Sequence, residues 1–311
     1  MKIEKLQQDE LLVAKKIISL SFGTFFGDPD PESFWSDIEY AATRYYANPS
    51  TAFAIKDGDQ LIGSNFVTRW GSVGFFGPMT VHPEYWESGA GQLLLKKAVE
   101  CFDEWGLAHT GLFTFAHSPK HIHLYQKLGF WPRFLTAIMI KDVPSEKMPV
   151  DILLFSQQTG EEQTAILKEC HELTNEIYEG LDLGLEINAV NAQKLGDTVL
   201  LYEYGELIGF AVCHCGEGSE AGRNKCYVKF AAVIPGGKVE ARFNKLLLAV
   251  ENYAVSQKVG LIEAGINLAC ISANNLMKQR DYKTDILGVA MMRNNDKGYH
   301  HEDSFVIDDW R

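Results

Sequence analysis

The clearest pattern of hydrophobic positions in the chain is helical and begins just after residue 89. The apolar side chains are spaced three and four residues apart, as on one face of a helix: Leu94, Leu95, Ala98, Phe102 and Trp105. This spacing predicts a helix that runs to about Trp105 and turns its apolar face toward a core.

The rest of the first half alternates between strand-like and helix-like segments. Runs rich in Phe, Val and Ile, separated by Asp-Gly and Trp-Gly turns, predict strands near residues 2–6, 51–56, 60–69, 73–81, 109–116 and 131–140. Start signals at Asp30-Pro31 and Ser118-Pro119 support two of the further helices, which are predicted at about 9–22, 31–46 and 118–128. The order of elements predicts an α/β layered domain with helices around a mixed, mostly antiparallel sheet.

The second half of the chain repeats the first. Asp-Gly-Asp-Gln-Leu-Ile-Gly at 57–63 matches Glu-Tyr-Gly-Glu-Leu-Ile-Gly at 203–209, and Val-His-Pro at 81–83 lines up with Val-Ile-Pro at 233–235. Helices predicted near 161–179, 240–256 and 268–279 complete the second copy. Two prolines at 144 and 149 break both patterns, so we expect two tandem domains, residues 1–143 and 150–311.

Residues 80–92 connect a strand end to the predicted helix through a loop with two glycines, Gly89 and Gly91. Unpaired backbone N–H groups at a helix N-terminus bind anions, and glycine leaves room for a phosphate to approach. On these residues alone, a plain strand-to-helix turn with closely packed glycines is the better explanation.

A second segment changes that balance. Tyr-Gln-Lys-Leu-Gly-Phe at 125–130 ends the helix predicted at 118–128. Together with Val-His-Pro at 81–83 and Trp-Glu-Ser-Gly-Ala-Gly at 86–91, it resembles the motifs of the GCN5-related N-acetyltransferases (GNAT) over about residues 1–141. The resemblance implies tandem GNAT domains that use acetyl-CoA and transfer its acetyl group to an amine by direct attack on the thioester.

The resemblance also implies which residues hold the cofactor. Backbone groups at the strand end would pair with the pantetheine arm, and N–H groups of the loop would bind the pyrophosphate. These residues are Met79, Thr80, Val81, Ser88, Gly89, Ala90, Gly91 and Gln92. Ser118 stands where relatives often have an asparagine near the cofactor, although a helix cap is its simplest role.

Tyr125 occupies the family's position for a general acid, where a phenol can protonate or hydrogen-bond the departing thiolate. The ordinary alternative is a half-buried helix tyrosine with a satisfied hydroxyl group. Many relatives carry a basic carboxylate just before Val-x-Pro, but Phe-Phe-Gly-Pro at 75–78 contains none. His117 is the nearest titratable candidate for a base, and an amine that arrives deprotonated needs no base at all.

Two loop positions depart from the family pattern, and the second copy departs further. Trp86 stands where the family has glutamine or arginine. Glu87 stands at a frequent glycine, where a carboxylate would repel phosphates unless it points away. In the second copy, the positions of Gly89, Gly91, Tyr125 and Gly129 hold Ala241, Phe243, Met277 and Asp281. We therefore expect a degenerate C-terminal copy that packs on the first.

Composition restricts the partners. The 29 Lys and Arg against 41 Asp and Glu give a net charge of −12, which disfavours nucleic acid. No apolar run reaches the roughly 18 residues of a membrane span, and the N-terminus lacks a signal-peptide pattern, so we expect no membrane partner and a cytoplasmic location. We expect no metal site, because Cys213-His214-Cys215 resembles a core strand and His300-His301 an exposed polar tail. A monomer and a homodimer both stay open.

The acceptor region is predicted in residues 21–35, where aromatic side chains alternate with Asp28, Asp30 and Glu32 and could hold an apolar amine. Equally, the aromatics are core residues and the acids are helix caps. The prediction is an acetyl-CoA-dependent N-acetyltransferase for an amine of a small molecule or peptide. Its alternatives are a non-catalytic acyl-CoA-binding or regulatory protein and a transferase of a longer acyl group.

Overall fold

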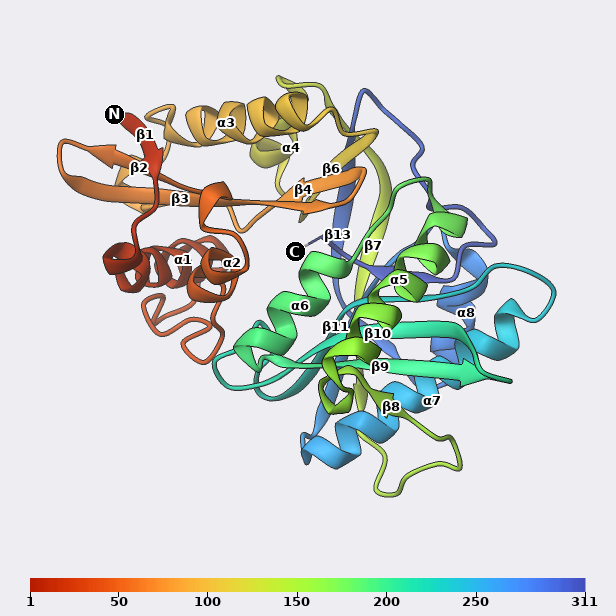
Figure 1. Cartoon of the computed structure of the whole chain (residues 1–311). Helices are drawn as coiled ribbons and strands as arrows, with labels where there is room; N and C mark the ends of the chain where they lie inside the picture. Colours follow the sequence, from red (N-terminus) through yellow and green to blue (C-terminus); the bar gives the residue numbers. More distant parts are fainter. Residues whose placement is uncertain (311) are drawn as a thin grey trace.

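The computed structural model describes residues 1–310, whose strands join into one continuous sheet of 14 strands (Figure 1). The order along the sheet is β1-β2-β3-β4-β6-β13-β7-β12-β11-β10-β9-β8, with β5 on β3 and β14 on β11. The strands are β1 (Lys2–Lys5), β2 (Ala52–Asp57), β3 (Gln60–Trp70), β4 (Val73–Phe76), β5 (Thr80–Val81), β6 (His109–Phe115), β7 (Phe130–Asp142), β8 (Leu153–Leu154), β9 (Gly196–Glu203), β10 (Glu206–Gly216), β11 (Gly222–Val233), β12 (Leu261–Asn267), β13 (Lys283–Arg293) and β14 (Val306–Asp308).

Helices cover both faces of this sheet in each half of the chain. In the first half, α3 and α4 bury their apolar sides on one face and α1 and α2 on the other, as the two layers around β1 to β3 in Figure 1 show. In the second half, α7 and α8 take one face and α5 and α6 the other. The helices are α1 (Leu11–Phe26), α2 (Ala41–Ala47), α3 (Ala90–Trp105), α4 (Pro119–Gln126), α5 (Gly160–Ile177), α6 (Gly184–Gln193), α7 (Val239–Gln257) and α8 (Ile271–Gln279). Among the described residues, no helix is long and apolar enough to cross a membrane.

The two halves exchange their last strands. β7, which ends the first half, pairs antiparallel with β12 of the second half through Ala264↔Met139. In the same way β13, a strand of the second half, pairs antiparallel with β6 of the first half through Ala290↔Phe113. β7 and β13 also pair with each other, and they run side by side between the two halves in Figure 1. The division of the chain at residues 143 and 150 stays a prediction, and the sheet itself continues across it.

Most predicted elements are confirmed, including the layered α/β class and the helix that ends at Trp105. The helix predicted at 31–46 is wrong in its first part, because a series of turns precedes α2. Trp35 takes a left-handed φ of 54°, which breaks a helix, and its ring packs 4.6 Å from that of Phe22. Sequence analysis also missed α6, which buries Ile187 and Val190 against the sheet of the second half.

Candidate functional site

The first half of the sheet opens beside β5. β4 pairs in parallel with β6 only as far as Phe75↔Gly111, whereas β5 pairs back with β3 through Gly63↔Val81. The single strand predicted at 73–81 is therefore wrong, because regular pairing stops between β4 and β5. The opening leaves one edge of β5 facing the end of β6 without direct pairing.

A cleft of about 540 Å³ occupies this opening. Strand β5 and the loop before α3 line one side, the end of β6 and helix α4 line the other, and aromatic side chains of α1 close one end. Seven of the predicted cofactor residues line it, namely Met79, Thr80, Val81, Gly89, Gly91, Gln92 and Ser118. Two predicted cofactor residues, Ser88 and Ala90, lie outside the lining; the Ala90 N–H donates to Ser88 Oγ at 3.3 Å.

The glycine loop has the features of an anion site. Gly89 caps α3 in the left-handed conformation with φ 90°, and within residues 1–310 the N–H groups of Gly89 and Gly91 have no acceptor. A Cβ added at Gly89 would meet nothing within 4 Å, and one at Gly91 would meet only Leu124, at 3.8 Å. Thr80 Oγ1, which is buried at the cleft wall, also lacks a hydrogen-bond partner within the described chain. These open donors fit the pyrophosphate and pantetheine groups of coenzyme A.

Tyr125 lines the same cleft from the last turn of α4. Its side chain is buried beside Phe76, with ring centroids 6.0 Å apart. Burial raises the pKa of the Tyr125 hydroxyl to about 12, and a hydrogen bond with Thr114 lowers it only in part. The phenol therefore stays protonated at neutral pH and can donate a hydrogen bond into the cleft. Gly129 then ends this segment with φ 85°, a left-handed conformation typical of glycine at a helix end.

Two histidines near Tyr125 differ in position. His117, the predicted base, stacks on Phe25 at 5.5 Å and lies outside the cleft lining. His121 lines the cleft one helical turn before Tyr125, a residue that sequence analysis overlooked. Burial lowers the pKa of His121, and the neighbouring charges of Lys120 and His117 lower it further. A neutral imidazole at neutral pH is the form that accepts a proton.

The two unusual loop residues have defined contacts. The indole Nε1 of Trp86 donates to the carbonyl oxygen of Val81 at 2.7 Å, which ties the loop to β5. Glu87 adopts φ 70°, a conformation that explains why relatives have glycine there. Its carboxylate accepts a hydrogen bond from Lys120 Nζ at 3.0 Å, and both residues line the cleft with exposed side chains. The Glu87 carboxylate therefore lies beside the proposed phosphate site, and Lys120 pairs with it.

The opposite end of the cleft is an aromatic chamber. Its walls come from α1, the turns before α2, the end of β6 and the C-terminal segment, and comprise Phe22, Phe25, Trp35, Phe113, Phe115 and Trp310. Three of the five aromatics of residues 21–35 line the cleft, namely Phe22, Phe25 and Trp35, whereas Phe26 and Phe34 do not. The acids Asp28, Asp30 and Glu32 also lie outside the lining, and the Asp28 carboxylate accepts from the Asp30 N–H as in a local turn. Nothing in the sequence pattern placed Trp310 here, because it arrives from the far end of the chain.

The second half lacks the corresponding opening. Phe243, at the position of Gly91, is fully buried and packs 5.4 Å from Phe305, and Met277, at the position of Tyr125, is also buried. β14 pairs with residues 230–232 of β11, which correspond to the cleft edge in the first half. The C-terminal strand therefore occupies the groove that the first half leaves open. Asp281 keeps the left-handed φ of Gly129, at 66°, so the helix end is retained while the ligand features are lost.

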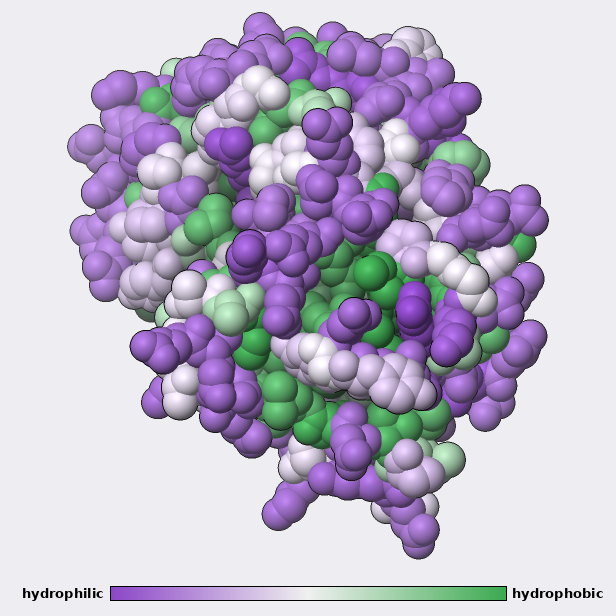
Figure 2. Space-filling view, turned by 45° about the vertical axis from the view of Figure 1, so that its right-hand side comes forward, coloured by the Kyte–Doolittle hydropathy of each residue, from purple (hydrophilic) through white to green (hydrophobic). Residues whose placement is uncertain are grey.

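Outside the cleft, two predictions about histidine and cysteine have different outcomes. His214 and Cys213 are buried in the core of the second half, as expected. His300 is buried, and its Nε2 lies 2.7 Å from Asp308 Oδ1, so the predicted exposed tail is wrong for this residue, whereas His301 is exposed as expected. Across residues 1–310, no cluster of His, Cys, Asp and Glu could hold a metal ion. The face in Figure 2 is mostly hydrophilic, and hydrophobic side chains gather in its hollowed centre.

The fold and the cleft together define an α/β protein whose sheet opens beside a cleft in the first half. Residues 16–130, in the first half of the chain, match the model of the acetyltransferase (GNAT) family. No curated protein matches the sequence.

Solved structures share the fold across the whole chain. A Pyrococcus horikoshii protein given as a candidate acetyltransferase is 13% identical, with a TM-score of 0.67 over 98% of this chain and 92% of that one. A GCN5-related N-acetyltransferase from Sphaerobacter thermophilus is 15% identical, with a TM-score of 0.61 over 94% and 95%. A tandem GNAT protein from the clavulanic acid biosynthesis pathway is 13% identical, with a TM-score of 0.57 over 95% and 99%. At these identities the likeness concerns the fold.

Proposed function

We propose that this chain is an acetyl-CoA-dependent N-acetyltransferase whose active site is the cleft of the first half. The main support is that one cleft brings together the glycine loop at the start of α3, the unpaired edge of β5 and the protonated phenol of Tyr125. Acetyl-CoA would supply the acetyl thioester, and the acceptor amine would attack its carbonyl carbon directly.

Different residues of the cleft bind the cofactor and transfer protons in the proposed reaction. The N–H groups of Gly89 and Gly91 bind the pyrophosphate, and Lys120, which contacts Glu87 of the loop, adds positive charge beside them. The edge of β5 aligns the pantetheine arm. Tyr125 keeps its proton at neutral pH and donates to the departing sulfur, a stabilisation worth about 10²-fold in rate. His121 takes the role first assigned to His117 and accepts the proton that the amine loses.

The aromatic chamber selects the acceptor. Its lining residues Phe22, Phe25, Trp35, Phe113 and Phe115 present apolar surface, and the centroid of each ring lies within 6.3 Å of that of at least one other ring of the set. Apolar walls exclude water and favour a primary amine attached to an aromatic or aliphatic group. We propose such an amine, on a small molecule or at the end of a peptide, as the acceptor.

The test is thiol release from acetyl-CoA measured across a panel of amines that ranges from arylalkylamines and apolar peptides to sugar amines. Release should be fastest with the apolar amines, and Tyr125→Phe should lower kcat about 100-fold while coenzyme A still binds. Acyl-CoAs of increasing chain length in the same assay test whether the transferred group is acetyl or longer.

A second candidate function is a non-catalytic acyl-CoA sensor. The pairing of Glu87 with Lys120 at the phosphate end favours it, because this pairing competes with phosphate binding. Tight binding of coenzyme A with no thiol release for any amine, and no effect of Tyr125→Phe, would support this candidate and contradict the acetyltransferase.

A further inference from the structure

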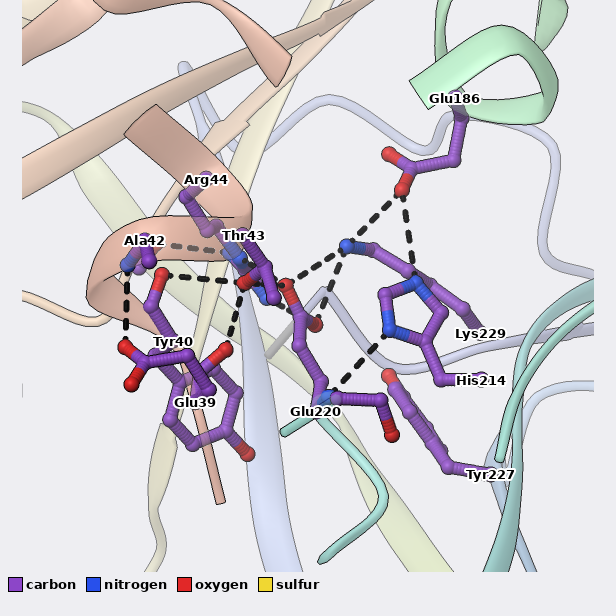
Figure 3. A network of polar contacts seen from close by, with 12 residues as sticks. Glu39, Tyr40, Ala42, Thr43, Arg44, Glu186, His214, Glu220, Tyr227 and Lys229 are labelled. Carbon is purple, nitrogen blue, oxygen red and sulfur yellow. Dashed lines mark hydrogen bonds and ion pairs between the residues drawn. The ribbon is translucent and has the colours of Figure 1, made fainter. Parts of the chain in front are cut away.

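A buried polar network joins the two halves of the chain directly beside the cleft (Figure 3). Arg44 comes from α2 of the first half. Glu186 of α6, His214 of β10, Lys229 of β11 and Glu220 of the turn between these two strands come from the second half. All five side chains are less than a tenth exposed.

Arg44 contacts both halves at once. Its Nε and Nη2 donate to the two carboxylate oxygens of Glu220 at 2.7 and 2.9 Å, a bidentate pair. Its Nη1 donates to the carbonyl oxygen of Gly77 at 2.7 Å. One rigid guanidinium therefore connects a carboxylate of the second half to a backbone carbonyl of the first.

The Gly77 carbonyl is at the point where the sheet opens. Gly77 lines the cleft, and it follows Phe75, the last residue of β4 that pairs with β6. Its N–H donates to Phe66 at 2.8 Å, which leaves the carbonyl for Arg44. A buried carbonyl at this place needs a donor, and here the donor is a side chain instead of a neighbouring strand.

Glu220 is itself firmly held. Lys229 Nζ donates to both of its carboxylate oxygens at 3.0 Å and lies 3.0 Å from Glu186, and the Glu220 N–H donates to His214 Nδ1 at 3.3 Å. Burial alone would raise the pKa of Glu220, but the charges of Arg44 and Lys229 outweigh burial and hold it well below its usual range. The carboxylate that anchors Arg44 is therefore charged.

A buried ion network of this kind is a poor source of stability, because desolvation offsets most of its attraction, but it fixes geometry. We propose that Arg44 is a positioning residue: anchored by Glu220, it holds the Gly77 carbonyl and so sets the edge of β5 against which the pantetheine arm lies. The second half thereby takes part in cofactor binding without a cofactor site of its own. This inference rests on the proposed function of the cleft.

The experiment compares wild type with Arg44→Lys, which keeps the charge but loses the fork that spans Glu220 and Gly77. Arg280→Lys is the matched control, because Arg280 makes a similar bidentate pair with Glu251, at 3.1 and 2.6 Å, and lies outside the cleft lining. The Kd for coenzyme A, the KM for acetyl-CoA and kcat are measured for each full-length protein.

Arg44→Lys should raise Kd and KM about tenfold and change kcat by less than about twofold, whereas Arg280→Lys should leave all three unchanged. The double variant Arg44→Met with Glu220→Gln removes the pair without leaving either charge on its own. This double variant should show the same loss of affinity for coenzyme A. The loss is measured as the rise in Tm on adding coenzyme A, which should be smaller than in wild type.

Unchanged cofactor affinity in both Arg44 variants, or an equal loss in Arg280→Lys, overturns the inference. A wild-type chain that does not bind coenzyme A overturns the proposed function instead, so the two failures are distinguishable.

Discussion

The indole Nε1 of Trp86 donates a 2.7 Å hydrogen bond to the carbonyl oxygen of Val81, which also accepts from Ser21 Oγ at 2.9 Å. The bond joins the loop before α3 to β5, so it couples the proposed pyrophosphate site to the proposed pantetheine edge. Trp86, which stands where the family has glutamine or arginine, thus contributes one fixed hydrogen-bond donor inside the cleft. We call this hydrogen bond between Trp86 and Val81 the clamp.

Removal of this clamp should weaken cofactor binding. Trp86→Phe keeps an aromatic ring but loses the donor, and a neutral hydrogen bond of about 1 kcal/mol corresponds to a roughly fivefold higher KM for acetyl-CoA with kcat little changed. Steady-state kinetics measures both constants. Trp131→Phe is the control, since Trp131 is half exposed on β7 and outside the cleft lining. An unaltered KM in Trp86→Phe would show that the clamp has no role in binding.

Glu87→Gly should improve the loop that Glu87 strains. Glycine adopts φ 70° without a Cβ penalty, and its introduction frees Lys120 for a phosphate. We expect the KM for acetyl-CoA to fall about threefold and the free energy of unfolding to stay within about 1 kcal/mol of wild type.

The control for this prediction is Glu84→Gly, at an exposed residue near the loop that does not take a positive φ. Glu84 lies in the 3-10 helix Pro83–Tyr85, so the variant should leave KM unchanged and lower stability by about 0.5–1 kcal/mol, the usual effect of added glycine flexibility in a helical turn. A rise in KM for Glu87→Gly would mean that the carboxylate aids binding.

The pH profile should identify the base. Because the pKa of His121 is lowered below 6.5, the neutral imidazole is the main form at pH 7, and kcat/KM should fall only as the pH drops below that lowered value. Tyr125, with a pKa near 12, should cause no alkaline loss around pH 10, where a free tyrosine ionises. His121→Gln should lower kcat about 100-fold and remove the acid limb. A profile that loses this limb in His117→Gln, and keeps it in His121→Gln, would restore the first assignment.

Short sequence patterns predicted helices well where the local pattern alone determines the conformation. The helical spacing from Leu94 to Trp105 and the proline after Ser118 both correspond to helices in the expected places. The turns around Trp35 were missed because tertiary contact with Phe22 overrides a good helix start signal. Helix propensity describes an isolated segment, and at Trp35 tertiary packing determines the backbone conformation instead.

Long-range features of the site left no local signal. The exchange of β7 and β13 depends on pairing between segments far apart in sequence, and the arrival of Trp310 in the cleft depends on β14. His121 and His117 are close in sequence, and only the direction of each side chain separates them. Nothing in the sequence distinguishes Arg44 from other helix arginines, because its partner Glu220 lies far away in the second half of the chain.

The central claim is that the chain binds one coenzyme A, and that it does so through the glycine loop of the first half. Calorimetric titration of acetyl-CoA into the full chain tests it most directly, together with Gly91→Phe, which places in the first half the residue type of Phe243. Wild type should bind one equivalent, and Gly91→Phe should bind none while its Tm stays close to wild type. Two equivalents in wild type, no binding in wild type, or full binding in Gly91→Phe would contradict the account.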